Sequence, residues 1–271
     1  PSHGCLMFCW RRLRSILVLA SLLLVQAIRC AHSDAKPPNI LFIYTDDQSH
    51  RTVSCYDEAF DWVKTPNIDQ LAREGVRFRR AYIGSWCMPS RATLLTGHHQ
   101  HGIESMRMEG PYPGSAYNPE QCRFWPSAFR QQGYATAHIG KWHTGVDAGF
   151  GRDWDHQKVW NRPRHPENAP NYYDNQLIST DGGEPVMVDG YTTDNYTDWA
   201  IDFIQGEARN PEKPWYLWLC YGAVHGPFTP AERHQQDYAG VDVPVPADVY
   251  PPRAGKPAYV QEMEFWEPGK D

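Results

Sequence analysis

Short apolar runs that stop at polar residues are the most regular feature of the chain. The first run, Ile40 to Tyr44 in PPNILFIYTDDQSH, ends just before two adjacent carboxylates, Asp46 and Asp47. A continuous apolar run that follows prolines predicts a strand buried on both faces, as in a parallel sheet covered by helices. PWYLWLCYGAVHGPF predicts a second strand of this kind, from Trp215 to Tyr221, with His225 beyond its end.

Amphipathic segments between these runs predict helices. TPNIDQLAREGVRF fits a helix that begins at Pro66, after Thr65 as N-cap, and ends at Gly75. Its apolar side chains are expected to point inward: Ile68, Leu71 and Ala72. A second helix is expected to begin around Arg91 in PSRATLLTG and to end near Gly97.

A helix and a strand follow one another in the middle of the chain. The helix is expected from Pro126 to Gln132 and is stopped by Gly133, after which YATAHIG predicts a strand that ends at KWH. Between Gly145 and Gly190 the abundance of Asn, Asp, Pro and Tyr predicts long loops with short elements, where substrate-recognition residues usually lie. A helix from about Thr193 to Gln205 is expected to bury three apolar side chains: Trp199, Phe203 and Ile204.

The polar residues beyond these strand ends define a candidate site. They are Asp46, Asp47, Lys141, His143 and His225. In parallel α/β sheets ligands bind at the edge formed by the carboxyl ends of the strands, because the loops converge there. The predicted fold class is therefore α/β, with a mostly parallel central sheet flanked by helices, and the five side chains are expected to meet at one edge.

Composition and charge limit the possible functions. The 271 residues are 41% hydrophobic and 21% charged, which is typical of a globular protein. The length suffices for one large domain with a sizeable core or for two small domains. The net charge is −6, and no basic run occurs outside the first residues. Binding to nucleic acid therefore has no electrostatic support.

Residues 1–33 are expected to form a signal peptide preceded by a few upstream residues. Three arginines precede an apolar run from Ile16 to Ile28, which is too short to span a bilayer. Small residues follow, so cleavage is expected after Ala27 or Ser33. We therefore expect export to the periplasm or the exterior without stable membrane insertion, and residues 34–271 are expected to form the mature part of the chain.

The cysteines outside that segment form neither a zinc motif nor a disulfide scaffold, because they are widely spaced and include no CxxC pair. Cys122 and Cys220 are interpreted as buried apolar residues. Cys87 differs, because it lies in SWCMPSRATLLTG just before the predicted helix and four residues before Arg91. A thiol in that position would be acidified and nucleophilic, and the helix start and guanidinium suit a phosphate or sulfate group. The alternative is a small buried residue beside a surface arginine.

The other candidates also allow two interpretations each. Asp46 and Asp47 repel each other, and Ca²⁺ or Mg²⁺ bound by oxygen atoms would compensate, whereas the alternative is an N-cap followed by a solvated acid. Lys141 and His143 lie two apart on the same side of an extended segment, where lysine can neutralise an oxyanion and histidine can move protons. The alternative for both, and for His225, is an ordinary strand exit or turn.

Two longer segments resemble one known family, the formylglycine-dependent type I sulfatases of the alkaline phosphatase superfamily. CMPSRATLLTG, from Cys87 to Gly97, resembles the first signature of that family, C-x-P-S-R. GYATAHIGKWH, from Gly133 to His143, resembles the second, G-Y-x-T-x-x-x-G-K-W-H. NILFIYTDDQ, TPNIDQLAREGVRF and VHGPF also resemble family segments and occur in the family order, so the resemblance covers about residues 38–230.

The resemblance implies a nucleophile and a metal site. Cys87 would be oxidised during export, by a formylglycine-generating enzyme, to an aldehyde whose hydrate attacks the sulfur of a sulfate ester and later expels sulfate. Asp46, Asp47 and the modified Cys87 would bind Ca²⁺, with Mg²⁺ as the alternative ion.

The resemblance also implies roles for four further residues. Arg91 would hold the hydrated aldehyde, and Lys141 would contact the sulfate oxygens. His143 would hydrogen-bond the hydrate and assist sulfate elimination, and His225 would help the alcohol to leave. The expected substrate is a sulfate ester, and aromatic and Asn-rich loops between Gly149 and Gly190 favour a sulfated carbohydrate.

Family members carry an Asp-Asn-Gly or Asp-His-Gly block and another lysine further along, and neither occurs before Asp271. The chain is therefore expected to be the N-terminal portion of a sulfatase catalytic domain, truncated before the C-terminal part and inactive alone. Two alternatives stay open. One is a phosphodiesterase or phosphonate hydrolase of the same superfamily, and the other is a non-catalytic protein that binds sulfated glycans.

Overall fold

A computed structural model of the chain describes residues 36–103, 123–206, 209–244 and 253–262. The predicted signal peptide and Cys122 lie outside these residues. The chain divides into two compact units. The first contains residues up to Gln48 together with Phe78–Phe228, and the second contains Ser49–Arg77 together with Thr229–Asp271. No helix in the described part of the chain combines the length and the apolar character that a membrane crossing requires.

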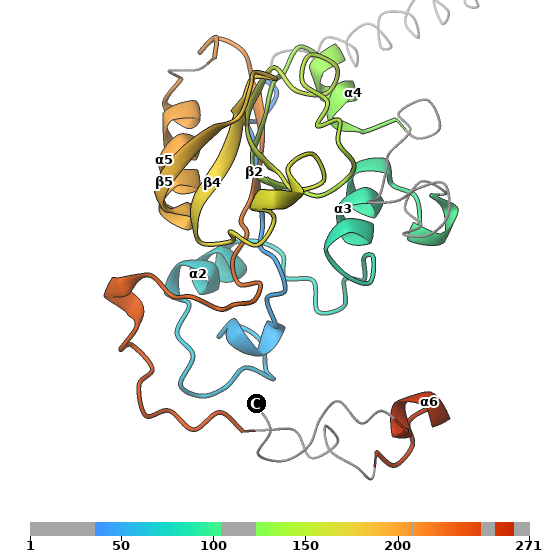
Figure 1. Cartoon of the computed structure of the whole chain (residues 1–271), viewed down its shortest axis with the longest axis vertical. Coiled ribbons are helices and arrows are strands. Elements are labelled where there is room, and N and C mark those ends of the chain that lie inside the picture. The colour runs from blue at the N-terminus through green and yellow to red at the C-terminus, as the bar shows by residue number, and fades with distance from the viewer. Residues whose placement is uncertain (1–35, 104–122, 207–208, 245–252, 263–271) are drawn as a thin grey trace, which may run out of the picture. The chain divides into compact units, whose positions relative to one another are not determined.

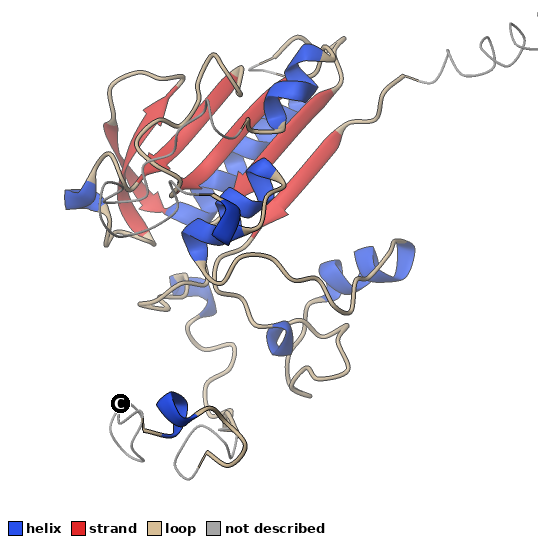
Figure 2. Cartoon of the chain, turned by 90° about the vertical axis from the view of Figure 1, so that its right-hand side faces the viewer, coloured by secondary structure: helices blue, strands red, loops and turns tan. Residues whose placement is uncertain are grey.

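The first unit is built on a six-stranded sheet in the order β1-β6-β2-β3-β4-β5 (Figure 2). Its strands are β1 (Ile40–Tyr44), β2 (Ala135–Trp142), β3 (His156–Asn161), β4 (Asp174–Thr180), β5 (Val186–Tyr191) and β6 (Trp215–Cys220). The pairs β1–β6, β6–β2 and β2–β3 are parallel, whereas β3–β4 and β4–β5 are antiparallel. The sheet is thus mostly parallel, as the sequence predicts.

Helices cover both faces of this sheet (Figure 1). On one face, α5 (Thr192–Gln205) buries Tyr196, Ala200 and Phe203 against the strands. On the other face, α3 (Cys87–Thr96) and α4 (Pro126–Gln131) pack over an aromatic cluster that includes Trp218. Strands β2 and β6 lie at the centre, and every residue of both is buried. The architecture is therefore the predicted α/β fold.

Strand β1 forms where the apolar run predicts it, but only one of its faces is buried. Ile40, Phe42 and Tyr44 pack against the aromatic cluster, whereas Leu41 and Ile43 are 43% and 49% exposed. The reason is the strand order: β1 is an edge strand, and α5 lies mainly over β2, β4, β5 and β6. Burial on both faces was therefore a wrong expectation for β1.

The segment from Gly145 to Gly190, expected to be mainly loops, contains three strands. Strand β3 has few apolar residues, and β4 and β5 form an antiparallel hairpin at the sheet edge. None of the three contains an apolar run longer than three residues. Polar residues can still be buried there because they are hydrogen-bonded. Gln176, for example, donates to Asn171 O at 2.6 Å and accepts a hydrogen bond from the Tyr196 hydroxyl.

The predicted helices form with small changes. Helix α5 begins one residue earlier than expected, and Trp199 and Ile204 are half-buried while Phe203 is buried. Helix α2 (Pro66–Glu74), in the second unit, has the predicted bounds. The same unit contains α6 (Ala258–Gln261).

The inward face of α2 differs from expectation at two of three positions. Ala72 is half-buried, but Ile68 is 42% exposed and Leu71 is 67% exposed. Asp69 is half-buried instead, and its carboxylate accepts hydrogen bonds from Ser54 Oγ at 2.8 Å and Thr65 Oγ1 at 2.9 Å. These hydroxyl contacts orient the helix and leave its two larger apolar side chains exposed.

Candidate active site

Asp46 is fixed by the loops that follow β1 and β6. Its backbone N–H donates to Ala223 O at 2.9 Å, and its carbonyl accepts from Val224 N at 2.7 Å. These two bonds continue the pairing of the parallel strands beyond their ends. The Asp46 side chain is only 3% exposed and lies at the carboxyl edge of the sheet.

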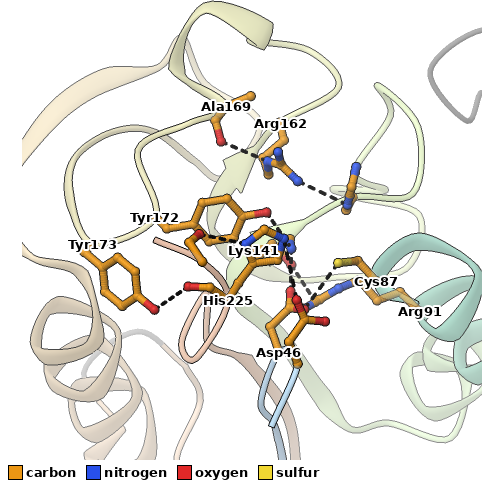
Figure 3. Close-up of polar contacts among 12 residues, drawn as sticks. Asp46, Cys87, Arg91, Lys141, Arg162, Ala169, Tyr172, Tyr173 and His225 are labelled. Atoms are coloured by element: carbon orange, nitrogen blue, oxygen red, sulfur yellow. Dashed lines mark hydrogen bonds and ion pairs between the residues drawn. The ribbon is translucent and has the colours of Figure 1, made fainter. Parts of the chain in front are cut away.

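Two buried cations share the carboxylate of Asp46 (Figure 3). Arg91 Nη2 lies 3.0 Å from Oδ2, and Lys141 Nζ bonds to the same oxygen. Burial opposes the charged form of the acid, but Arg91 and Lys141 outweigh it and lower the pKa of Asp46 to about 2. Burial and repulsion by Arg91 lower the pKa of Lys141, and Asp46 only partly offsets them. With two cations and one carboxylate, the buried cluster of Asp46, Arg91 and Lys141 has an excess of positive charge.

Lys141 reaches this cluster from within strand β2, not from beyond its end as expected. Gly140 precedes it with φ of +105°, and a Cβ there would lie 2.1 Å from the carbonyl oxygen of Cys220. Only glycine allows β2 and β6 to approach so closely at that position. Arg91 Nη1 donates to Lys141 O at 3.0 Å, which ties helix α3 to the same point of β2.

Cys87 is the first residue of α3, so the helix begins four residues before the predicted start at Arg91. The preceding turn packs against this helix start. Ser90 Oγ donates to Gly84 O at 2.7 Å, and a Cβ on Gly84 would lie 2.4 Å from the backbone of Pro89. Because that turn is closely packed, the side chain of Cys87 is directed at Asp46, whose Oδ1 accepts from Sγ at 3.3 Å.

The thiol of Cys87 is not acidified, contrary to the expectation from sequence. Burial raises its pKa, and the carboxylates of Asp46 and Asp47 add to that effect, although Lys141 opposes it. Burial and nearby negative charge both raise a thiol pKa. An unmodified Cys87 is therefore protonated and weakly nucleophilic at neutral pH.

Asp47 and His225 complete a group of possible metal ligands. The ligand atoms of Asp47, Cys87 and His225 all lie within 4.8 Å of one another, and Asp47 Oδ2 is 3.7 Å from His225 Nε2. Asp47 has φ of 52°, a left-handed conformation that aspartate tolerates better than most residues. Because Asp46 Oδ1 also contacts Sγ, the three predicted metal ligands Asp46, Asp47 and Cys87 converge, and their carboxylates suit Ca²⁺ or Mg²⁺.

His225 has a defined orientation. Its Nδ1 lies 2.8 Å from Gly226 O, and since a carbonyl only accepts, Nδ1 carries a proton. The ring stacks on Tyr172 with centroids 3.9 Å apart and planes tilted by 11°. Tyr172 OH in turn accepts from Lys141 Nζ at 3.2 Å.

Tyr172 and Arg162 are site residues that the sequence analysis does not identify. Arg162 directly follows β3, so it also lies just beyond the carboxyl end of a parallel strand. The rule that selects Asp46 and His225 would have selected Arg162 if β3 had been recognised. Arg162 Nη1 lies 3.4 Å from Nδ1 of His143, which links this predicted site residue to the others.

A separate cavity of about 720 Å³ lies at the other end of the sheet. It is lined by residues at or before the starts of β2, β3 and β6, such as Tyr134, Asp155 and Lys213. Two of its three arginines form ion pairs, Arg130 with Asp155 at 2.6 Å and Arg152 with two carboxylates, and Arg123 donates to Ser127 Oγ at 2.8 Å. None of the predicted site residues lines this cavity, so it is not part of the site.

Comparison with known proteins gives one consistent result. The family model described as Sulfatase matches residues 38–261. The chain is 32% identical over 253 residues to an N-acetylglucosamine-6-O-sulfatase of Bacteroides thetaiotaomicron, covering 92% of this chain and 42% of that protein. It is 29% identical over 218 residues to the N-acetylgalactosamine-6-sulfatase of Homo sapiens, covering 71% of this chain and 40% of that protein.

Solved structures agree with this result. One protein, solved with its substrate D-glucosamine-2-N,6-O-disulfate, is 32% identical and superposes with a TM-score of 0.65 over 79% of this chain and 40% of its own. Another, Ps i-CgsB solved with k-i-k-neocarrahexaose, is 26% identical with a TM-score of 0.61 over 77% of this chain and 50% of its own. The chain thus spans about two fifths of the length of the curated relatives described above.

Proposed function

The chain belongs to the sulfatase family, and on that premise we propose that the protein hydrolyses a sulfate ester at the site beside Cys87. The observation that carries the proposal is the excess of buried positive charge next to that residue. Arg91 and Lys141 are 1% and 0% exposed and share one carboxylate, that of Asp46. A sulfate group entering beside Cys87 would meet two fixed cations, which stabilise an anion without reorganisation.

We further propose that Asp46, Asp47 and the side chain of Cys87 bind a divalent cation, Ca²⁺ or alternatively Mg²⁺, and that Cys87 is converted to formylglycine by a dedicated enzyme. The convergence of the two carboxylates on Sγ supports the metal site. The raised pKa of Cys87 supports the modification, because the unmodified thiol is a poor nucleophile. When present, the cation and the hydrated aldehyde would supply a positive charge and an oxygen nucleophile.

The chain's own residues would bind and orient the ester. Lys141 would donate to the sulfate oxygens from a position fixed by Asp46 and Tyr172. Arg91 would hold the group formed from Cys87 and balance the acids around it. His225 would face the ester oxygen, held in place by its stacking on Tyr172.

For the substrate we propose a 6-O-sulfated amino sugar. The support is the relative named N-acetylglucosamine-6-O-sulfatase and the structure solved with D-glucosamine-2-N,6-O-disulfate, each 32% identical to this chain. We also propose export of the protein, on the basis of the apolar run from Ile16 to Ile28.

The test uses protein expressed from the complete gene together with a formylglycine-generating enzyme. We expect calcium-dependent hydrolysis of an aryl sulfate, faster than that of the matched aryl phosphate diester, and loss of both activities in Cys87→Ala. Mass spectrometry of the Cys87 peptide is expected to show the aldehyde. Faster hydrolysis of the diester would favour the phosphodiesterase alternative, and binding of sulfated sugars without turnover would favour the non-catalytic one.

Substrate choice is tested separately with sulfated monosaccharides. N-acetylglucosamine 6-sulfate is expected to be hydrolysed faster than the 3-sulfate of the same sugar. Equal rates for the two positions would contradict the proposed preference and leave the sulfatase assignment intact.

A further inference from the structure

The side chain of Arg162 is held by three contacts in addition to the one with His143. Its Nε donates to Ala169 O at 3.1 Å. The guanidinium also lies over two aromatic rings, 4.9 Å from the centroid of Tyr172 and 5.4 Å from that of Trp160. Trp160 and Tyr172 are both buried, so the guanidinium rests against rigid partners on two sides.

From this fixed position Arg162 contacts one nitrogen of His143. Its Nη1 lies 3.4 Å from Nδ1 of the imidazole. A guanidinium has only donors, so Nδ1 must be the acceptor and must carry a lone pair. In a neutral imidazole the single proton is then on the other nitrogen, Nε2.

His143 is neutral under ordinary conditions. Burial is the main cause, and the charges of Lys141, Arg162 and Arg91 add to it, so that the pKa of His143 is lowered to about 3 although Asp46 opposes them. The histidine therefore has one proton between pH 5 and pH 8, and its place on the ring is set by the contact with Arg162.

We propose that Arg162 is a positioning residue that fixes the Nε2–H tautomer of His143, so that Nδ1 accepts from Arg162 and Nε2 carries the proton. The inference rests on the proposed function for its effect on hydrolysis, whereas the tautomer is a property of the free protein. A single tautomer gives the imidazole one defined arrangement of donor and acceptor, as an outer hydrogen-bond partner does for other functional histidines.

The first test measures the tautomer directly, in protein expressed from the complete gene and labelled with ¹⁵N-histidine. Long-range ¹H–¹⁵N spectra, assigned with His143→Asn, are expected to show an unprotonated Nδ1 and a protonated Nε2 throughout pH 5–8. Arg162→Lys keeps a donor and should keep this pattern, whereas Arg162→Met should give a mixture of tautomers. The matched control is Arg164→Met, because Arg164 is exposed two residues further on. A proton on Nδ1 in the wild type overturns the proposal.

The second test measures hydrolysis of an aryl sulfate by the same proteins. Arg162→Met is expected to lower kcat about 10- to 100-fold with little change in KM, the size typical of removing an outer partner that orients a histidine. Arg162→Lys should recover most of the rate, and Arg164→Met should match the wild type. If Arg162→Met keeps the wild-type kcat, the inference is wrong and the sulfatase proposal stands. If the wild type hydrolyses no sulfate ester, the proposed function fails, and the spectra alone decide the tautomer.

Discussion

Strand β2 carries two buried ionisable side chains in very different surroundings. Lys141, 0% exposed, lies in the ionic cluster, where its Nζ donates to Asp46 and to Tyr172. His138, also 0% exposed, lies three residues earlier in an aromatic cage on the other face of the strand. The cage consists of three indole rings with centroids 4.9 to 5.4 Å from the imidazole: Trp142, Trp154 and Trp218.

The two environments favour opposite charge states of the buried side chain. Neither ring nitrogen of His138 has a hydrogen-bond partner within the described residues. Burial, with a smaller effect of Arg91, lowers the pKa of His138 to about 3, so the ring is neutral. A buried charge persists on this strand only where counter-charges surround it, at the end that faces the site. The interior of the same strand depends on the absence of charge.

The largest expected effect comes from breaking the ionic cluster. Asp46→Asn removes the one carboxylate that Arg91 and Lys141 share, and it leaves two buried cations without a counter-charge. We expect the free energy of unfolding to fall by about 3–5 kcal/mol, measured by urea denaturation at pH 7. Asp147→Asn is the control, because that carboxylate is 51% exposed. Equal losses in the two variants would show that burial of the cluster is not what matters.

Because the aromatic cage keeps His138 neutral, the free energy of unfolding should decrease in acid. In the unfolded chain His138 binds a proton below about pH 6.5, whereas in the folded protein its pKa is about 3. The unfolded state thus binds more protons between these values, and stability falls as the pH drops through that interval, by about 4 kcal/mol in all. Urea denaturation of the wild type and His138→Leu across pH 7–3 isolates this contribution as the difference between their slopes. If the free energies of unfolding of the two proteins have the same pH dependence, His138 does not cause the acid sensitivity.

A third variant, Lys141→Met, tests the ionic cluster by its activity. Lys141→Met keeps the length of the side chain and removes the donor expected to contact the sulfate. We expect kcat/KM for an aryl sulfate to fall roughly 10²–10³-fold, as for loss of one donor to a developing oxyanion. Lys213→Met, in the separate cavity at the other end of the sheet, should leave kcat/KM unchanged. A comparable loss in both variants would mean that general surface charge, not the fixed position of Lys141, assists the reaction.

The smallest effect is expected at the exposed ion pair between Asp147 and Arg152. The Asp147 side chain is 51% exposed and that of Arg152 is 37% exposed. Exposed pairs of this kind contribute about 0–1 kcal/mol because water and salt screen them. Asp147→Asn should therefore lower the free energy of unfolding by less than about 1 kcal/mol, and this difference should shrink further in high salt.

The residues at the carboxyl edge of the sheet could be predicted from sequence. Asp46 and His225 follow apolar runs that are clear strands, and parallel strands bring their ends to one edge whatever the details of packing. The same rule failed for Arg162, because β3 contains too few apolar residues to be recognised. The exposure of Leu41 and Ile43 could not be predicted either, since it depends on the order of strands, which no local pattern contains.

The electrostatic properties of the site also depend on distant contacts. The position of Cys87 at a helix start pointed to an acidic thiol, but the pKa is raised by burial and by two carboxylates from a segment about 40 residues earlier in the chain. The cage around His138 is equally non-local, because its three indoles come from separate segments. Sequence thus identifies which chemical groups meet, whereas the charge on each group requires the three-dimensional neighbours.

The pairing of β1 with β6 determines when this site can form. Ile40 lies opposite Tyr216, so β1 leaves the ribosome long before its partner has been made. At a synthesis rate of about 5–20 residues per second, β6 is completed on the order of ten seconds or more after β1. Until then the apolar side chains of β1 have no partner strand. Asp46, the first site residue to be synthesised, gains its backbone partners only when Ala223 and Val224 arrive. The site therefore cannot form until β6 and the loop that follows it have been synthesised.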